Sequence, residues 1–312
     1  MKVAFIFPGQ GSQYVGMGRQ MYEHFPAARR TFEEADASLG FTLSRLCFEG
    51  PAEELQHTVN AQPAILTVSV ACLRVLLEKG VEPSVAAGHS LGEYSALVAA
   101  GTITFADAVK IVRKRGQFMQ EAVPLGTGGM MAVLGLDLPS VEEVCRRASG
   151  AGVVEAVNLN CPGQVVIAGE MRALERACAL AMEAGARRCI PLAVSAPFHS
   201  SLMRPAGERL RRELERVPMA DPRFPIVANV TADYVTSSGE VKELLVRQVY
   251  SPVRWEESMR RIMAGGIQAF VEVGPGTVLC GLLRKINRQV QCWSVQDPDS
   301  LEKVLACLGE VG

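Results

Sequence analysis

The 312-residue chain has almost no net charge and no long uninterrupted apolar run. Lys and Arg number 32 against 33 for Asp and Glu, so no global field attracts nucleic acid or an anionic membrane surface. The longest apolar stretch, residues 64–77, is interrupted by Arg74 and is shorter than the ~20 residues that span a bilayer. We therefore expect neither a nucleic-acid-binding protein nor a transmembrane protein.

Cysteine and histidine lack the spacings of metal ligands. The nine cysteines form no C-x-x-C pair, which argues against a disulfide framework and against a structural zinc site. The four histidines, His24, His57, His89 and His199, are not spaced as metal ligands either. The first apolar run, residues 3–7, is too short for a secretory signal peptide. We expect a cytoplasmic protein without a bound metal.

The composition is that of a globular protein, with 48% hydrophobic and 21% charged residues. Residues 3–7 and 85–87 are short apolar runs that end at turns and predict buried strands. Residues 93–100 predict a helix that stops at Gly101. Because strands and helices alternate, we predict an α/β main domain with a largely parallel sheet. Later elements of this domain are a helix near residues 202–216 and strands at 226–229 and 269–273.

A separate pattern fills the middle of the chain. Its order of strand, helix, two strands, helix and strand is the ferredoxin-like βαββαβ motif. We predict a small inserted domain over residues 123–194, between two parts of a large domain, residues 1–122 and 195–312. The strands are expected at 130–134, 153–157, 164–168 and 189–194, and the helices at 141–148 and 173–183.

The segment Gly88-His89-Ser90-Leu91-Gly92 joins a predicted strand to a predicted helix. This G-x-S-x-G pattern is typical of a nucleophile elbow, in which glycines permit a strained turn that exposes the serine hydroxyl. The helix that follows would stabilise an oxyanion with its N-terminal N–H groups. An ordinary turn with a serine near the helix cap is the alternative. We predict that Ser90 is a nucleophile for covalent acyl transfer.

A serine nucleophile needs a base, and His199 is the best candidate. His89 adjoins Ser90 in a tight turn, where side chains diverge, and His24 and His57 lie in charged stretches. His199 follows a predicted strand and a turn, where α/β folds place their sites. No carboxylate stands out as its orienting partner, so a backbone carbonyl near Gln248 could hold the imidazole. The order also differs from that of α/β-hydrolases, whose histidine lies near the C-terminus.

Arg115 is predicted to lie on the apolar side of a helix, where a surface arginine is not expected. At about 100° per residue, Arg115 falls beside Ala108, Val112 and Met119 on the apolar side of the helix predicted from Phe105. An arginine there reaches solvent, joins a structural ion pair or binds an anion, and its planar fork suits a carboxylate. If Arg115 faces the site, the acyl group carries a free carboxylate.

The loop Pro8-Gly9-Gln10-Gly11 follows the first predicted strand. Its backbone N–H groups could bind an oxyanion or a phosphate, although a plain tight turn explains it equally well. A third glycine in register is missing, so the loop is not a dinucleotide fingerprint, and the chain has no Walker A sequence.

Together these motifs resemble the acyltransferase family of fatty acid and polyketide synthesis, which includes the malonyl-CoA:acyl carrier protein transacylases. The resemblance covers essentially the whole chain. The matching segments, in order, are residues 7–13, 62–64, 88–95, Arg113-x-Arg115-Gly116, residues 158–169, Pro197-Phe198-His199, residues 227–230 and residues 272–276.

This resemblance implies roles for the candidate residues. Ser90 would be the malonylated nucleophile and His199 its base. Gln10 and Leu91 would supply oxyanion-hole N–H groups, and Arg115 would bind the free malonyl carboxylate. The substrates would be malonyl-CoA and holo acyl carrier protein, with no cofactor and no metal.

The resemblance also implies an α/β-hydrolase-like core plus a ferredoxin-like insert, with the site between them. The remaining implied substrate-binding residues are Gln62, Met119, Asn160 and Phe198, and the backbone carbonyl of Gln248 would orient the base. Phe198 occupies a position where many free-standing members have a smaller residue. In having phenylalanine there, the chain resembles malonyl-selective polyketide acyltransferases.

Two other functions compete with malonyl transfer. A hydrolase or thioesterase would share the elbow but not Arg115, and a non-catalytic module would bind carrier protein without forming an ester. The basic pairs Arg113-Lys114 and Arg187-Arg188 cannot be assigned to a carrier-docking surface from the sequence. The sequence does not distinguish a fatty acid from a polyketide pathway.

Overall fold

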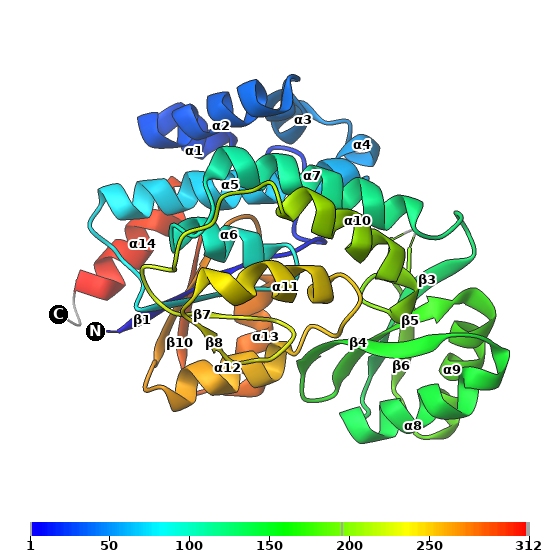
Figure 1. Ribbon diagram of the computed structural model, residues 1–312. Coiled ribbons are helices and arrows are strands. Elements are labelled where there is room, and N and C mark those ends of the chain that lie inside the picture. The colour runs from blue at the N-terminus through cyan, green and yellow to red at the C-terminus, as the bar shows by residue number, and fades with distance from the viewer. Residues whose placement is uncertain (1, 195, 310–312) are drawn as a thin grey trace.

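The computed structural model describes residues 2–194 and 196–309, and its centre is a six-stranded sheet (Figure 1). The strand order is β10-β9-β1-β2-β7-β8. All neighbours are parallel except β7 and β8, which form an antiparallel pair. The predicted largely parallel sheet is therefore confirmed. Its strands are β1 (Val3–Phe7), β2 (Val85–Gly88), β7 (Ile226–Val227), β8 (Tyr234–Val235), β9 (Ala269–Val273) and β10 (Gln291–Val295).

Strand β1 shows why a strand of this sheet has apolar residues at every position. Val3, Phe5 and Phe7 join one hydrophobic cluster, and Ala4 and Ile6 join another on the opposite face. A strand covered on both faces needs apolar side chains at every position. Helices accordingly lie on both sides of the sheet in Figure 1. They are α1 (Arg19–His24), α2 (Pro26–Leu39), α3 (Leu43–Glu49), α4 (Ala52–Gln56), α5 (Thr58–Glu78), α6 (Gly92–Ala99), α7 (Phe105–Glu121), α10 (Arg204–Leu214), α11 (Ser238–Gln248), α12 (Trp255–Ala264), α13 (Val278–Ile286) and α14 (Pro298–Gly309).

A second, four-stranded sheet forms a lobe beside the first (Figure 1). Its order is β4-β5-β3-β6, and all its neighbours are antiparallel. The elements follow the predicted order of strand, helix, two strands, helix and strand. Ser195, the first residue of the predicted return to the large domain, lies outside the described residues. The elements are β3 (Gly128–Leu134), α8 (Leu138–Ala148), β4 (Val154–Cys161), β5 (Gln164–Glu170), α9 (Met171–Glu183) and β6 (Arg188–Pro191).

Helix α5 is longer and more apolar than the sequence pattern indicated. By length and composition it is the one helix among the described residues that could cross a membrane, but 83% of its apolar stretch is buried inside the fold. It packs against α2 and α7 in the helical layer on one side of the sheet. The helix is therefore the central core helix of this layer.

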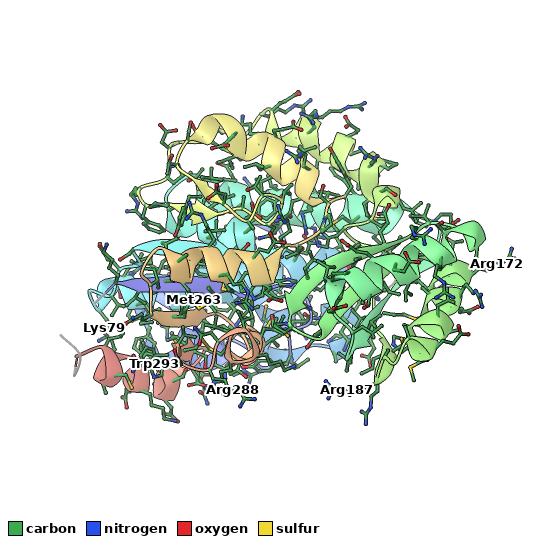
Figure 2. All side chains as sticks on the ribbon, turned by 90° about the horizontal axis from the view of Figure 1, so that it is seen from below. Lys79, Arg172, Arg187, Met263, Arg288 and Trp293 are labelled. Atoms are coloured by element: carbon green, nitrogen blue, oxygen red, sulfur yellow. A yellow bond between two sulfur atoms is a disulfide. The ribbon has the colours of Figure 1, made fainter. Side chains whose placement is uncertain are left out.

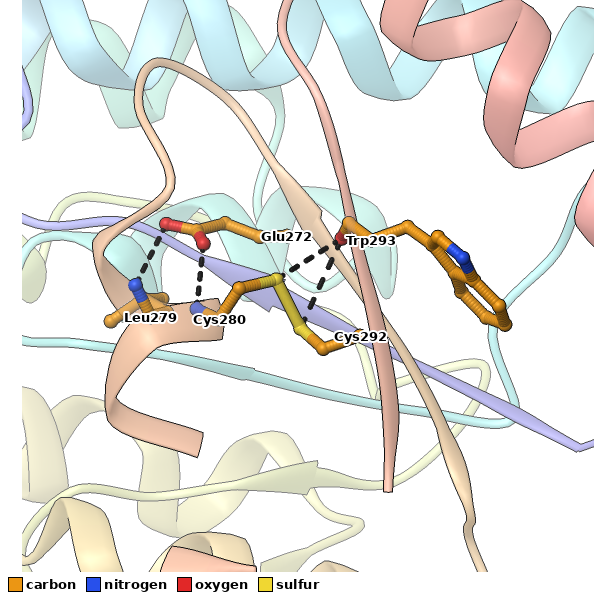
Figure 3. Close-up of a disulfide and its surroundings, with 5 residues drawn as sticks. All are labelled: Glu272, Leu279, Cys280, Cys292 and Trp293. Carbon is orange, nitrogen blue, oxygen red and sulfur yellow. Dashed lines mark hydrogen bonds between the residues drawn. A yellow bond between two sulfur atoms is a disulfide. The ribbon is translucent and has the colours of Figure 1, made fainter. Parts of the chain in front are cut away.

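One disulfide joins α13 to β10, through Cys280 and Cys292 (Figure 3). Beside it, the buried carboxylate of Glu272 accepts hydrogen bonds from the N–H groups of Leu279 and Cys280, at 3.0 and 2.8 Å. The sequence argued against a disulfide framework and did not indicate this single pair. Two cysteines 12 residues apart form no recognisable motif, and the sulfurs meet because α13 packs against β10.

Basic side chains lie on the outer surface of the second lobe, where Figure 2 shows Arg172 and Arg187. Arg187 and Arg188 are both exposed.

Candidate active site

Ser90 lies in a sharp turn between β2 and α6, with a positive φ of 51°. A non-glycine residue in this region is strained. The flanking glycines make the turn possible: a Cβ on Gly88 would lie 1.8 Å from the carbonyl carbon of Gly92, and one on Gly92 would lie 2.0 Å from the oxygen of Phe7. The structure thus has the elbow geometry that the glycine spacing predicted.

Asn229, just after β7, holds the strained turn closed. Its Oδ1 accepts a hydrogen bond from the N–H of Ser90 at 2.7 Å, and its Nδ2 donates to the oxygen of Gly88 at 2.7 Å. Asn229 is fully buried. The sequence placed it in a matching segment but gave it no role, because a contact across 139 residues leaves no local signal.

His199 lies directly beside the nucleophile. Its Nε2 is 2.7 Å from the Oγ of Ser90, and its Nδ1 is 2.7 Å from the backbone oxygen of Gln248 at the end of α11. Because a carbonyl only accepts, Nδ1 carries the hydrogen and Nε2 is free to take the serine proton. The orienting group is therefore a backbone carbonyl, as the missing carboxylate indicated.

The imidazole of His199 is neutral at ordinary pH. Burial lowers its pKa to about 3, and the positive charge of Arg115 acts in the same direction. The hydrogen bond to Gln248 opposes this shift without reversing it. The neutral ring is the form that a general base requires.

Arg115 is a buried cation that points at the nucleophile. It is 1% exposed, and its Nη2 donates to the Oγ of Ser90 at 3.1 Å and to the Oε1 of Gln248 at 2.9 Å. Its Nη1 donates to the Oε1 of Gln62 at 2.8 Å. These acceptors are neutral, and Nε has no partner among the described residues. A buried guanidinium without a carboxylate in direct contact has the chemistry to pair with an anion beside Ser90.

The loop after β1 packs directly against the elbow. A Cβ on Gly9 would lie 2.4 Å from the carbonyl oxygen of His89, so only glycine permits this approach. The neighbouring N–H of Gln10 and the N–H of Leu91 have no acceptor within residues 2–194 and 196–309. Two free N–H groups beside a serine hydroxyl are the arrangement that stabilises an oxyanion.

These groups meet in a cavity of about 350 Å³. Both lobes contribute to its wall, since Met130 and Asn158 come from the second sheet. Gln248 does not line the cavity and acts from behind His199. The predicted site residues that line it are Gln10, Gln62, Ser90, Leu91, Arg115, Met119, Phe198 and His199.

Asn160 does not line the cavity, and its predicted contact with substrate stays a prediction. Its Oδ1 lies 2.8 Å from the Nε2 of His89, so the pair ties β4 to the elbow. Asn158 lines the cavity instead, and its buried Oδ1 has no partner among the described residues. The sequence could not choose between them, because β4 contains irregularities in its pairing on both sides of Leu159.

No group of three or more His, Cys, Asp or Glu side chains that could hold a metal ion occurs within the two described ranges. The groups described above around Ser90 are side chains and backbone groups of this chain.

Comparison with known proteins identifies the family. The acyl transferase domain family matches residues 4–301. The chain is 52% identical over 310 residues to the malonyl CoA-acyl carrier protein transacylase of Bacillus subtilis (strain 168), covering 99% of this chain and 98% of the relative. It is 48% identical over 303 residues to the protein of the same name from Escherichia coli (strain K12), covering 97% and 98%.

Solved structures agree. The acyl-carrier-protein S-malonyltransferase from Burkholderia pseudomallei 1710b matches with a TM-score of 0.96 and 49% identity, covering 98% of this chain and 100% of that one. A malonyl-transacylase in complex with its type II PKS acyl-carrier protein matches with a TM-score of 0.96 and 46% identity, covering 98% and 99%. The chain therefore belongs to the acyl transferase family, among the malonyl CoA-acyl carrier protein transacylases.

Proposed function

We propose that this chain transfers the malonyl group of malonyl-CoA to the phosphopantetheine thiol of acyl carrier protein, through a malonyl ester on Ser90. The observation that carries the proposal is the position of Arg115, a buried cation whose Nη2 lies 3.1 Å from the nucleophilic Oγ. A serine–histidine pair alone fits any acyl group. The adjacent guanidinium selects an acyl group that ends in a carboxylate.

The first half-reaction loads the serine. His199 Nε2 takes the proton of Ser90 Oγ as the oxygen attacks the thioester carbonyl. The N–H groups of Gln10 and Leu91 stabilise the tetrahedral oxyanion. Collapse of this intermediate breaks the carbon–sulfur bond, and His199 returns the proton to the departing sulfur, so that CoA leaves as a thiol and His199 is neutral again.

The second half-reaction runs the same steps with a different thiol. His199 takes the proton of the carrier's phosphopantetheine thiol, whose sulfur attacks the malonyl ester. The same two N–H groups stabilise the oxyanion. Ser90 leaves as an alkoxide and recovers its proton from His199, so the enzyme returns to its starting state without a metal or another cofactor.

The acyl group would lie between polar and apolar walls. Arg115 would bind the malonyl carboxylate, with Gln62 fixing the guanidinium through the 2.8 Å contact to its Nη1. Met119 and Phe198, which line the cavity, would pack against the short carbon chain. Filling the cavity in this way would exclude water, which favours transfer over hydrolysis.

We also propose the finer architecture and location. Residues 1–122 and 195–312 would form an α/β-hydrolase-like domain, and residues 123–194 a ferredoxin-like domain with its own hydrophobic cluster. The site would lie between them. Seven free cysteines favour a cytoplasmic location.

Mass spectrometry of the intact protein after mixing with malonyl-CoA tests the function. We expect a single malonyl adduct, mapped by proteolysis to the peptide that contains Ser90, which disappears when holo acyl carrier protein is added. Release of free malonate without malonyl-carrier would instead indicate a hydrolase. Complete absence of an adduct would leave only a binding module.

The low pKa of His199 predicts the acidic side of the pH profile. Its folded-state pKa is lowered to about 3, so the ring binds a proton only near that pH and remains a base above it. The kcat/KM for malonyl-CoA should therefore show no loss due to His199 between about pH 5 and pH 8, although an ordinary histidine would titrate near 6.5. The same profile is measured for Glu93→Gln. Burial raises the pKa of Glu93 to about 7, inside this pH range, and the variant removes that titrating carboxylate. A loss of activity centred near 6.5 in both backgrounds would contradict the assignment.

Asn158 should contribute to substrate binding. Asn158 lines the cavity and its buried Oδ1 has no partner among the described residues, and an amide N–H of the pantetheine arm would supply one. We expect Asn158→Ala to raise the KM for malonyl-CoA roughly 5- to 10-fold, the value of one hydrogen bond, with kcat little changed. Asn160→Ala is the comparison, since it removes the contact with His89 and should lower the melting temperature instead. An unchanged KM in Asn158→Ala would refute the contact.

A further inference from the structure

A buried polar cluster behind the cavity takes no part in the proposed steps. Its centre is Glu93, on α6, which is 2% exposed. The Oε2 of Glu93 accepts hydrogen bonds from the N–H of Asn229 at 3.0 Å and from the Nε2 of Gln248 at 2.8 Å. Burying a carboxylate is costly, and burial raises the pKa of Glu93 to about 7. A side chain kept at such a position requires a reason.

Gln248 connects this carboxylate to the reacting groups. Its side-chain Oε1 accepts from the Nη2 of Arg115 at 2.9 Å, and its Nε2 donates to the backbone oxygen of Ser90 at 2.9 Å as well as to Glu93. Its backbone oxygen holds the Nδ1 of His199. One residue therefore contacts the nucleophile's backbone, the base and the carboxylate receptor.

The two ends of the Gln248 amide are not interchangeable here. If the amide turned over, its NH₂ would face the guanidinium of Arg115, donor against donor. Its oxygen would then face the oxygens of Glu93 and Ser90, acceptor against acceptor. The charged donor Arg115 favours the observed orientation from one side of the amide, and the carboxylate of Glu93 adds a charged acceptor on the opposite side.

We propose that Glu93 is a positioning residue for acyl transfer, because its carboxylate fixes the amide of Gln248 in the orientation that serves Arg115 and Ser90. This inference rests on the proposed function. Through Gln248, Glu93 sets both the rate of attack and the selectivity for a carboxylate. Through the N–H of Asn229, it also supports the residue that holds the elbow closed.

The variants Glu93→Gln and Glu93→Leu separate this role from others. Both are uncharged and similar in size, but only glutamine keeps an oxygen for Asn229 and Gln248. The matched controls are Glu272→Gln and Glu272→Leu. Glu272 is also fully buried, accepts two backbone N–H groups and has a pKa raised by burial to about 7, but its hydrogen bonds go to Leu279 and Cys280 and not to Gln248.

The measurements are the single-turnover rate of Ser90 acylation and the preference for malonyl-CoA over acetyl-CoA. We expect Glu93→Leu to lower both by about 10- to 100-fold, as displaced reacting groups do. Glu93→Gln should restore both to within about threefold, since it keeps the acceptor. The Glu272 variants should change only the melting temperature.

Three results would overturn the proposal: wild-type values in Glu93→Leu, equal losses in the leucine and glutamine variants, or a slower rate with unchanged preference. If Glu93→Leu does not fold, Gln248→Met decides, because it keeps the backbone carbonyl for His199 and removes the amide. An unchanged malonyl preference in that variant also overturns the proposal. Wild-type enzyme that forms no malonyl ester in the same assay would instead refute the proposed function.

Discussion

Replacing Ser90 with alanine is expected to abolish the malonyl adduct and to lower transfer to the carrier by roughly 10⁴- to 10⁶-fold, as removal of a covalent nucleophile does. The loss is large because, among the described residues, no other hydroxyl contacts both a histidine ring and an arginine guanidinium. The Oγ of Ser90 is within 2.7 Å of a neutral imidazole and 3.1 Å of the guanidinium of Arg115. Rapid-quench transfer assays and intact-mass spectra measure the two effects.

Ser95→Ala is the matched control for this change. Ser95 lies on α6, the helix that follows Ser90, is fully buried and has no hydrogen-bond partner for its Oγ among the described residues. Its removal should leave adduct formation and transfer unchanged. A malonyl adduct that persisted in Ser90→Ala would place the ester on another residue and end the proposed mechanism.

The nucleophile and its base were predictable because each left a local or compositional signal. The elbow needs glycines at two fixed positions, since Cβ atoms there would overlap the backbone at 1.8 and 2.0 Å, and the sequence has both. His199 followed from the small number of histidines and from its place after a strand. Arg115 followed from helical periodicity, which put a cation on the apolar face of α7.

Features that depend on distant pairing were not predictable. Asn160 and Asn158 are equivalent in a regular strand, and only the irregular pairing of β4 decides which one faces the cavity. The disulfide likewise depends on how α13 packs against β10. Hydrophobic periodicity carries no information about either contact, because both join residues that are neighbours only in the folded chain.

The buried contact between Glu93 and Gln248 was also not predictable from the sequence. Glu93 occurs at the start of a predicted helix, where an acidic residue ordinarily complements the helix dipole at the surface. The structure buries it instead against Gln248, 155 residues further along the chain. A sequence pattern predicts which face of an element is apolar, but not which polar side chain the fold will bury with a partner.

Arg115→Ala is expected to remove most of the enzyme's preference for malonyl-CoA over acetyl-CoA. In the free enzyme the guanidinium is buried and contacts only neutral acceptors, so the malonyl carboxylate would be its first direct counter-charge. Loss of a desolvated charge pair is worth about 2–5 kcal/mol, or roughly 30- to 5,000-fold in relative kcat/KM. Acetyl-CoA has no carboxylate, so its kcat/KM should fall much less or rise.

Arg115→Lys and Lys110→Ala complete this test. Lysine keeps the charge but not the planar fork, so it should recover only part of the preference, because one ammonium cannot reproduce the contacts that Arg115 makes to Gln62, Ser90 and Gln248 at once. Lys110 is exposed on the same helix and should have no effect. An unchanged ratio of kcat/KM for malonyl-CoA to kcat/KM for acetyl-CoA in Arg115→Ala would show that the cation supports the fold without binding the substrate's carboxylate. Equal activity of the lysine and arginine enzymes would show that charge alone, and not the fork, selects the carboxylate.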